Sequence, residues 1–107
     1  MQRVVLVRYD AKPDRAAENE ALSRKVFDEL RAVRPDGVTY ALFRDGDAFV
    51  HVFINMAADD STALTELASF KAFAEDVLER CVAPPEQTRL SVQLVEAYGL
   101  SSAMAMA

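Results

Sequence analysis

The amino-acid sequence predicts an α+β fold, a single domain in which two helices cover one face of a four-stranded antiparallel sheet. The first observation is composition, because 107 residues with 51% hydrophobic and 27% charged side chains suit one globular domain. The second is the order of the segments, whose patterns run strand, helix, strand, strand, helix, strand. The third is an Asp45-Gly46 pair between two apolar runs, which is typical of a tight β-hairpin.

The N-terminal part of the chain predicts a strand followed by an amphipathic helix. Residues Arg3 to Tyr9 are β-branched and almost continuously apolar, as expected of a central strand covered on both faces. Pro13 ends this strand, and Asp14 supplies a carboxylate that can cap the first turn of a helix. One apolar stripe then follows helical spacing up to the turn at residues 34–37, and it consists of Leu22, Val26, Leu30 and Val33, with Phe27 beside it.

Residues 38–56 predict the hairpin. With Asp45 and Gly46 as the central residues of the turn, Tyr40 lies opposite His51 and Val38 lies opposite Phe53. Side chains alternate between the two faces of a strand. One face of the hairpin therefore carries Val38, Tyr40, Leu42, Phe49, His51, Phe53 and Asn55, and the other carries Thr39, Ala41, Phe43, Val50, Val52 and Ile54. Both faces are mostly apolar, so both must be covered.

The C-terminal half predicts a second helix and a last strand. We expect the helical region from about Thr62 to Val82, with capping side chains at residues 57–61 and a break allowed at Ser69. Two prolines end it, and Arg89 to Ala97 alternates between apolar and polar residues as a strand does. The sequence thus predicts one domain over residues 1–100 and a short tail, SSAMAMA, at residues 101–107.

Right-handed crossovers place both helices on one face of the sheet and the first and third strands at its centre, a ferredoxin-like βαββαβ arrangement. Two helices can cover only one face. The other face would leave apolar side chains such as Phe49 and Phe53 in water, and an exposed patch of this kind usually marks an interface. The sequence therefore predicts a homodimer in which two sheets pack face to face as a dimeric α/β barrel.

The charge and the cysteine content exclude several classes of function. A formal net charge of −5 argues against a nucleic acid or an anionic membrane as partner, since both attract basic surfaces. The chain starts with a strand pattern rather than the apolar core of a signal peptide. Cys81, the single cysteine, can form no internal disulfide, so we expect a cytoplasmic protein. One histidine without paired cysteines predicts no metal site, and the glycines at turns predict no nucleotide-binding loop.

Polar residues on the predicted strands are the candidates for a functional site. His51 is the only histidine, and in a sheet-lined cavity it could act as a general base or hydrogen-bond a substrate. Tyr40 and Asn55 share its face and complete the candidate catalytic set. Other groups that could hold a planar ligand are Arg8, Ser91 and Gln93, with Phe49 and Phe53 as apolar wall. The same polar groups could instead pair across a dimer interface without any ligand.

Two segments carry a family resemblance, namely the hairpin YALFRDGDAFVHVFINM and the second-helix run LTELASFKAFAEDV with Ser69, Phe70 and Phe73. From Val4 to Tyr98 the chain resembles the antibiotic-biosynthesis monooxygenase-like proteins of the dimeric α/β-barrel superfamily. Characterised members include quinone-forming monooxygenases, haem-degrading enzymes, and small decarboxylases or isomerases. The first two groups use a pocket tryptophan, and this chain has none. The haem-degrading members also use a histidine on the second helix, a residue type that this chain lacks there.

The resemblance implies a cofactor-independent monooxygenase that acts on phenolic or polycyclic aromatic substrates, because an electron-rich phenol can itself reduce oxygen. In this interpretation His51 is the base or orienting group, and Tyr40, Asn55 and Arg8 fix the ligand. The alternative is a non-catalytic dimer that binds a small ligand or a partner. A cavity that holds His51, Tyr40 and Asn55 within mutual reach favours the enzyme, whereas a filled interface favours the alternative.

Overall fold

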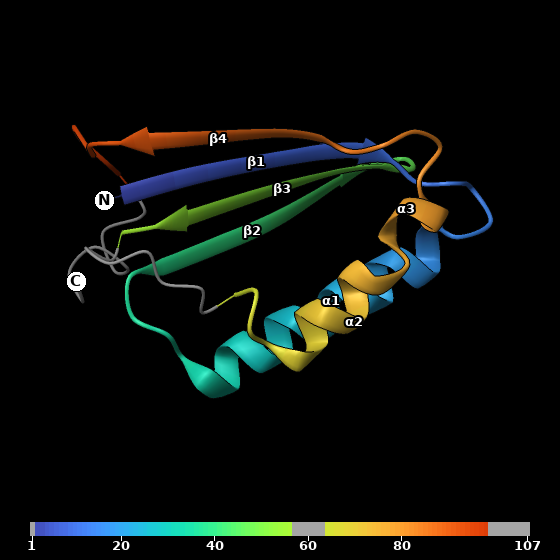
Figure 1. The fold of residues 1–107 in the computed structure, drawn as a ribbon, viewed down its shortest axis with the longest axis horizontal. Coiled ribbons are helices and arrows are strands. Elements are labelled where there is room, and N and C mark those ends of the chain that lie inside the picture. The colour runs from blue at the N-terminus through green and yellow to red at the C-terminus, as the bar shows by residue number, and fades with distance from the viewer. Residues whose placement is uncertain (1, 57–63, 99–107) are drawn as a thin grey trace.

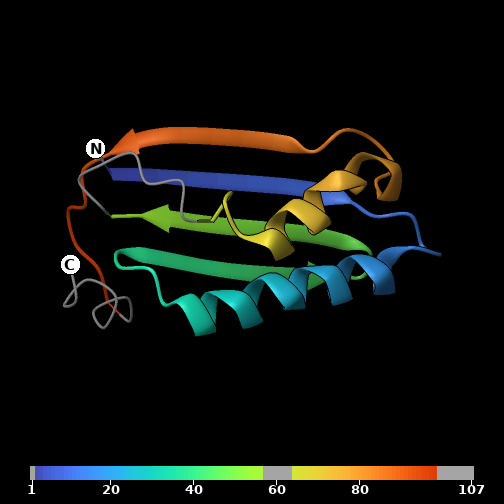
Figure 2. The same ribbon diagram turned by 60° about the horizontal axis from the view of Figure 1, so that its bottom comes forward.

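The computed structural model of the protein describes residues 2–56 and 64–98. The elements follow the predicted order: β1 (Gln2–Asp10), α1 (Ala16–Val33), β2 (Val38–Asp45), β3 (Ala48–Asn55), α2 (Ala68–Glu75), α3 (Val77–Arg80) and β4 (Glu86–Val92). The strands pair antiparallel in the order β2-β3-β1-β4, so β1 and β3 are central as predicted. All helices lie on one side of the sheet (Figures 1 and 2), which confirms the ferredoxin-like α+β fold. The predicted tail, 101–107, lies outside the described residues.

The hairpin is present, but its register differs by two residues from the prediction. Asp45 pairs with Ala48, Leu42 with His51, and Tyr40 with Phe53. Gly46 and Asp47 are therefore the central residues, and Gly46 alone has positive φ, at 61°. A type II′ turn requires positive φ only at its first central position, whereas the predicted type I′ turn requires it at both. Because the shift is an even number of residues, every side chain keeps its predicted face.

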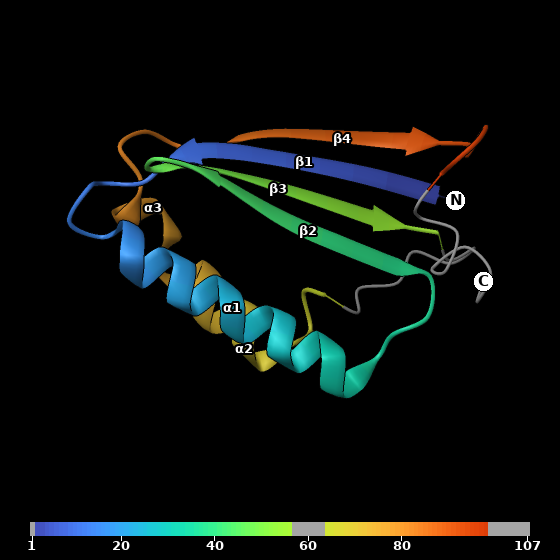
Figure 3. The same cartoon turned by 180° about the vertical axis from the view of Figure 1, so that it is seen from behind.

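The prediction that Phe49 and Phe53 lie on the open face of the sheet is wrong. β1 pairs Val5 with Phe53, Val7 with His51 and Tyr9 with Phe49, and this set faces the helices. The open face, which the helices leave uncovered in Figure 3, carries the opposite parity. Its side chains from the central strands and β2 are Val4, Leu6, Arg8, Thr39, Ala41, Phe43, Val50, Val52 and Ile54. Both faces are apolar, so alternation alone does not say which of them the helices cover.

The second helical region starts later than predicted and contains a break. α2 begins at Ala68, where the Glu29 carboxylate of α1 accepts hydrogen bonds from the Ser69 backbone amide at 2.9 Å and from Ser69 Oγ at 2.5 Å. The cap thus comes from another helix. Asp76 separates α2 from α3, and β4 ends at Val92, five residues before the predicted Ala97. The predicted caps at 57–61 and the expected start at Thr62 lie outside the described residues.

The core lies between the helices and the sheet. Phe49 is fully buried and stacks on Tyr9 at a ring-centroid distance of 5.7 Å, and Val26 of α1 packs into the same cluster. Cys81 and Phe73 are also buried there, as their patterns predicted. Of the helices in the described part of the chain, none combines the length and the apolarity needed to cross a membrane.

Candidate functional site

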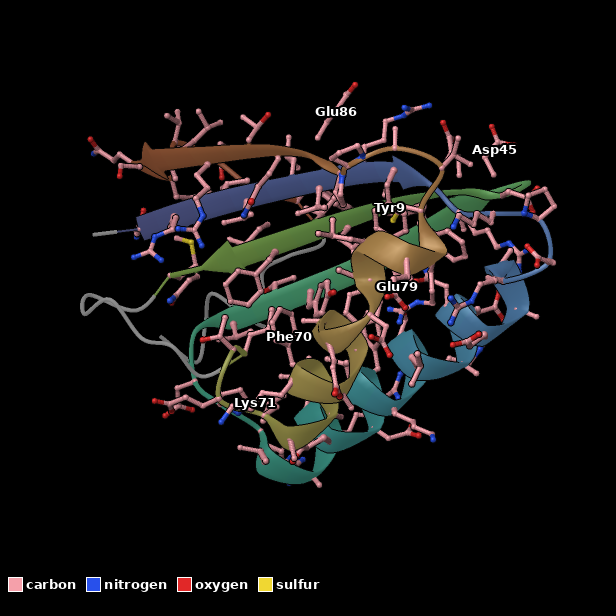
Figure 4. All side chains as sticks on the ribbon, turned by 45° about the vertical axis from the view of Figure 1, so that its right-hand side comes forward. Tyr9, Asp45, Phe70, Lys71, Glu79 and Glu86 are labelled. Atoms are coloured by element: carbon pink, nitrogen blue, oxygen red, sulfur yellow. The ribbon has the colours of Figure 1, made fainter. Side chains whose placement is uncertain are left out.

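A cavity of about 440 Å³ lies between the sheet and the segments around α2 and α3, within the size range of small-molecule sites. Residues in register across the strands build its floor. One row is Tyr40, Phe53, Val5 and Arg89, and the next contains His51, Val7 and Gln87. Aromatic and aliphatic side chains from the helical layer form the roof, including Phe70, Phe73 and Val77. Figure 4 shows Tyr9 and Phe70 in the layer between the sheet and α2.

His51 lies between two tyrosine hydroxyls on the cavity side of the sheet. Its Nε2 is 2.8 Å from the Tyr9 hydroxyl oxygen, and its Nδ1 is 2.7 Å from the Tyr40 hydroxyl oxygen. The imidazole is 5% exposed and contacts the Phe73 ring, with the ring centroids 5.5 Å apart. All three polar side chains line the cavity. Both ring nitrogens of His51 are thus engaged by tyrosine hydroxyls.

The hydrogen-bond network continues from Tyr9 into the helical layer. Asn19 Nδ2 of α1 donates to the Tyr9 hydroxyl at 2.8 Å, and Arg80 Nε of α3 donates to Asn19 Oδ1 at 2.9 Å. Arg80, only 1% exposed, also donates to the Phe73 carbonyl at 2.6 Å, and its guanidinium lies 5.0 Å from the centre of the Phe73 ring. A buried charge requires such partners. The network therefore joins β2, β3, β1, α1 and α3 through hydrogen bonds.

Burial controls the ionisation of the network. It lowers the pKa of His51 from 6.5 to about 4, since the imidazolium would lose its hydration. Burial also raises the pKa of Tyr9 to about 12, although the hydrogen bond from Asn19 opposes the shift. The pKa of Tyr40 is raised as well, first by burial and then by the charge that Tyr9 would carry. All three groups are therefore neutral at pH 7.

Acid should destabilise the fold through His51. Between pH 6.5 and about 4 the unfolded state binds a proton that the folded state does not, so stability falls as the pH drops. The expected loss from this residue is about 3 kcal/mol at pH 4, with none above pH 6.5. Denaturant unfolding of the wild type and of His51→Gln over this range measures the difference. Parallel stability curves for the two proteins would contradict the buried neutral imidazole.

Of the other predicted site residues, only some line the cavity. Phe53 lines the cavity, whereas Phe49 is a core residue behind it. Asn55 is buried one row away from Tyr40, between Val38 and Arg3, and is not part of the cavity wall. Arg8 and Gln93 do not line this cavity. Arg8 lies on the open face, 4.0 Å from the Asp10 carboxylate, and Gln93 is exposed beyond the end of β4.

The prediction missed Tyr9, Asn19 and Arg80. Tyr9 has the strand parity of Val5 and Val7, so its face was predictable but its hydrogen bonds were not. Asn19 precedes Leu22 by three residues and extends the apolar stripe of α1, which is a visible signal, because a polar residue on a core-facing stripe needs a partner. Arg80 carries no such signal, because a basic residue in the last turn of a helix is ordinarily an exposed cation near the negative end of the helix dipole.

Two arginines give the β1/β4 side of the cavity a positive charge. Arg3 and Arg89 occupy diagonal cross-strand positions, since Arg3 pairs with Ser91 and Arg89 with Val5. Both line the cavity, and no Asp or Glu side chain does so in the described part of the chain. Within residues 2–56 and 64–98, no cluster of three or more His, Cys, Asp or Glu side chains could hold a metal ion.

Comparisons with known proteins show the fold. No protein-family model matches the sequence, and no curated protein matches it. Among solved structures, Rv0793 from Mycobacterium tuberculosis is 24% identical, with a TM-score of 0.71 over 92% of this chain and all of that one. Two proteins named "putative antibiotic biosynthesis monooxygenase" are also similar. The one from Bacteroides thetaiotaomicron has 16% identity and a TM-score of 0.73, covering 91% of this chain and 94% of that one.

The second, from Caulobacter crescentus, has 20% identity and a TM-score of 0.70, covering 86% of this chain and 91% of its own. Each match spans most of both chains, which agrees with the resemblance seen in the hairpin and the second-helix run. These likenesses, all below 25% identity, concern the course of the backbone. The chain has the fold of the antibiotic-biosynthesis monooxygenase-like proteins.

Proposed function

We propose that the protein binds a phenolic or polycyclic aromatic molecule in this cavity and oxidises it with molecular oxygen. The observation that carries the proposal is the Tyr9-His51-Tyr40 network on the wall of an otherwise largely apolar cavity. Such a cavity suits aromatic rings, and a few polar groups suffice to orient them. Two proteins of similar structure carry the name antibiotic biosynthesis monooxygenase, which supports oxidation by molecular oxygen as the reaction class. The single cysteine, which is buried, supports action in the reducing cytoplasm.

The reaction balances without a bound cofactor. A phenol with a free para position reacts with one O₂ to give a quinone and one water. One oxygen atom forms a new bond to the ring carbon, the O–O bond breaks, and the other oxygen leaves as water with the hydroxyl hydrogen and the ring hydrogen of the substrate. The substrate itself supplies the four electrons that reduce O₂. In this scheme Tyr40 hydrogen-bonds the substrate oxygen and His51 holds Tyr40 in place.

Oxygen uptake tests the proposal directly. The protein is mixed with a panel of one-, two- and three-ring phenols, and O₂ consumption is measured together with the absorbance of the quinone product. We expect turnover with at least one polycyclic phenol and none with the corresponding arene that lacks the hydroxyl. Binding of these phenols without O₂ uptake would instead identify the non-catalytic ligand-binding protein. Neither binding nor uptake across the panel would reject the site.

We also propose that a second copy of the chain covers the open face of the sheet. Large apolar side chains are exposed on it, including Phe43 at 60%, Leu90 at 46% and Leu6 at 39%. An antiparallel sheet with this apolar pattern can pack on a two-fold copy of itself, which is the commonest arrangement of homo-oligomers. The cavity lies on the other face, so each copy would keep its own site.

Leu6→Glu is expected to convert the dimer to a monomer, because it places a charge at the centre of the proposed interface. Light scattering coupled to size-exclusion chromatography measures the mass. Val33→Glu, which changes a 56% exposed apolar residue on α1, is the matched control and should leave the mass unchanged. A monomeric wild type, or a dimeric Leu6→Glu protein, would rule out this interface.

A further inference from the structure

We infer that every hydrogen bond of the buried network is donated in the same direction, from Arg80 through Asn19, Tyr9 and His51 to Tyr40. Tyr40 then donates a hydrogen bond from its hydroxyl to an oxygen anion of the ligand. Arg80 sets the direction of these hydrogen bonds, because a guanidinium group can donate hydrogen bonds but cannot accept them. Arg80 Nε donates to Asn19 Oδ1, so the other atom of the Asn19 amide group, Nδ2, faces Tyr9. Asn19 therefore donates to the Tyr9 oxygen.

Tyr9 passes the direction on to His51. Its oxygen accepts from Asn19 Nδ2 at 2.8 Å and lies 2.8 Å from His51 Nε2. Tyr9 is 3% exposed, and no other partner of its hydroxyl exists among the described residues. A buried hydroxyl proton without an acceptor costs free energy. The Tyr9 proton thus points to His51 Nε2, which must be the unprotonated nitrogen.

His51 then carries its proton on Nδ1. A neutral imidazole has one protonated nitrogen, and the depressed pKa keeps this ring neutral at pH 7. Nδ1–H donates to the Tyr40 oxygen at 2.7 Å. Tyr40 has thereby accepted a hydrogen bond and keeps its own proton for a further partner. Among the five residues of the hydrogen-bond network, only Tyr40 is half-buried, and it lines the cavity. The partner of its proton is therefore a ligand atom.

The charges around the cavity favour an anion. The charged or titratable side chains that line it all come from the sheet, namely Tyr9, Tyr40, His51, Arg3 and Arg89. The described segments around α2 and α3 contribute none. No lining carboxylate among the described residues would repel a negative oxygen. The inference, which takes the ligand class from the proposed function, is that a phenol binds as its phenolate and releases its proton to solvent. His51 is then a positioning residue rather than the base.

The tautomer of His51 can be measured without any substrate. The protein has a single histidine, so a long-range ¹H–¹⁵N correlation spectrum of the ¹⁵N-labelled wild type shows one imidazole. Protonated and unprotonated ring nitrogens differ widely in ¹⁵N chemical shift. We expect the Nδ1–H form at pH 7. The Nε2–H form would overturn the inferred direction of the hydrogen bonds. The proposed oxidation is tested separately, by the oxygen-uptake assay.

Asn19→Asp should reverse the direction of the hydrogen bonds between Tyr9, His51 and Tyr40. The carboxylate still accepts from Arg80 but can no longer donate, so the Tyr9 proton turns toward it. Tyr9 then accepts from His51 Nε2–H, and Tyr40 donates to Nδ1. The spectrum of Asn19→Asp should show the opposite tautomer from the wild type. An unchanged tautomer would show that Asn19 does not set the direction.

The ligand end of the inference is tested with 2-naphthol, whose neutral and ionised forms absorb at different wavelengths. Titration of the bound probe should give an apparent pKa about one unit below that of free 2-naphthol, which means about tenfold tighter binding of the anion. Tyr40→Phe should abolish this shift. Tight binding of 2-naphthol with an unshifted or raised pKa would overturn the anion preference, although the cavity would remain a phenol site.

Discussion

Replacing Tyr40 by phenylalanine is expected to lower kcat/KM for a phenolic substrate by roughly a hundredfold. The loss of one preorganised donor to a developing or full oxygen anion has an effect of this size in other enzymes. The ring itself should stay in place, because it stacks on Phe27 at a centroid distance of 4.7 Å and meets Phe53 edge-on at 6.0 Å. Oxygen-uptake kinetics at saturating O₂ measure the change.

Tyr98→Phe is the matched control for this prediction, because Tyr98 is fully exposed and remote from the cavity wall. The control should keep wild-type kcat/KM. Circular dichroism and thermal unfolding of Tyr40→Phe should stay close to those of the wild type. Equal activity of Tyr40→Phe and Tyr98→Phe would show that the Tyr40 hydroxyl does not contact the reacting substrate.

Replacing Asn19 by leucine is expected to lower the free energy of unfolding by about 3–5 kcal/mol. The two side chains are similar in volume, so the effect is electrostatic. Without Asn19, the buried Arg80 guanidinium loses the acceptor of its Nε–H, and the Tyr9 hydroxyl loses its donor. Urea unfolding of the purified protein measures the change.

Ser23→Ala provides the comparison for this variant. Ser23 is buried on the same helix, and its hydroxyl only donates to the Asn19 backbone carbonyl one turn earlier. That bond competes with the helix's own hydrogen bonds, so we expect a loss below about 1 kcal/mol. A cost for Asn19→Leu as small as that for Ser23→Ala would mean that Arg80 and Tyr9 are satisfied without Asn19.

The sequence predicted the order of the elements because each carries its own local signal. The period of the first helix, the Asp-Gly turn and the apolar strands are all readable within a few residues. The N-terminus of α2 was harder to place, because Glu29, distant in sequence, supplies its cap. The end of β4 was harder for a similar reason, since alternation continues past Val92 although pairing with β1 stops there.

The candidate site was only partly predictable. Strand parity put Tyr40, His51 and Phe53 on one face, and a shift of two residues in register left that result intact. Parity could not decide between the helix-covered face and the open face, so the sequence did not show that Arg8 lies on the face opposite this cavity. Arg80 and Asn19 are 61 residues apart, and nothing local in the sequence indicates that they meet.

The cavity beside the Tyr9-His51-Tyr40 network is expected to bind a phenolic molecule. A crystal structure of the protein grown with 2-naphthol tests it most directly. We expect the two rings between Phe53 and Phe70 and the naphthol oxygen within hydrogen-bond distance of the Tyr40 hydroxyl. A cavity closed by repacked side chains, or naphthol bound only elsewhere on the molecule, would show that this cavity is not a phenol site.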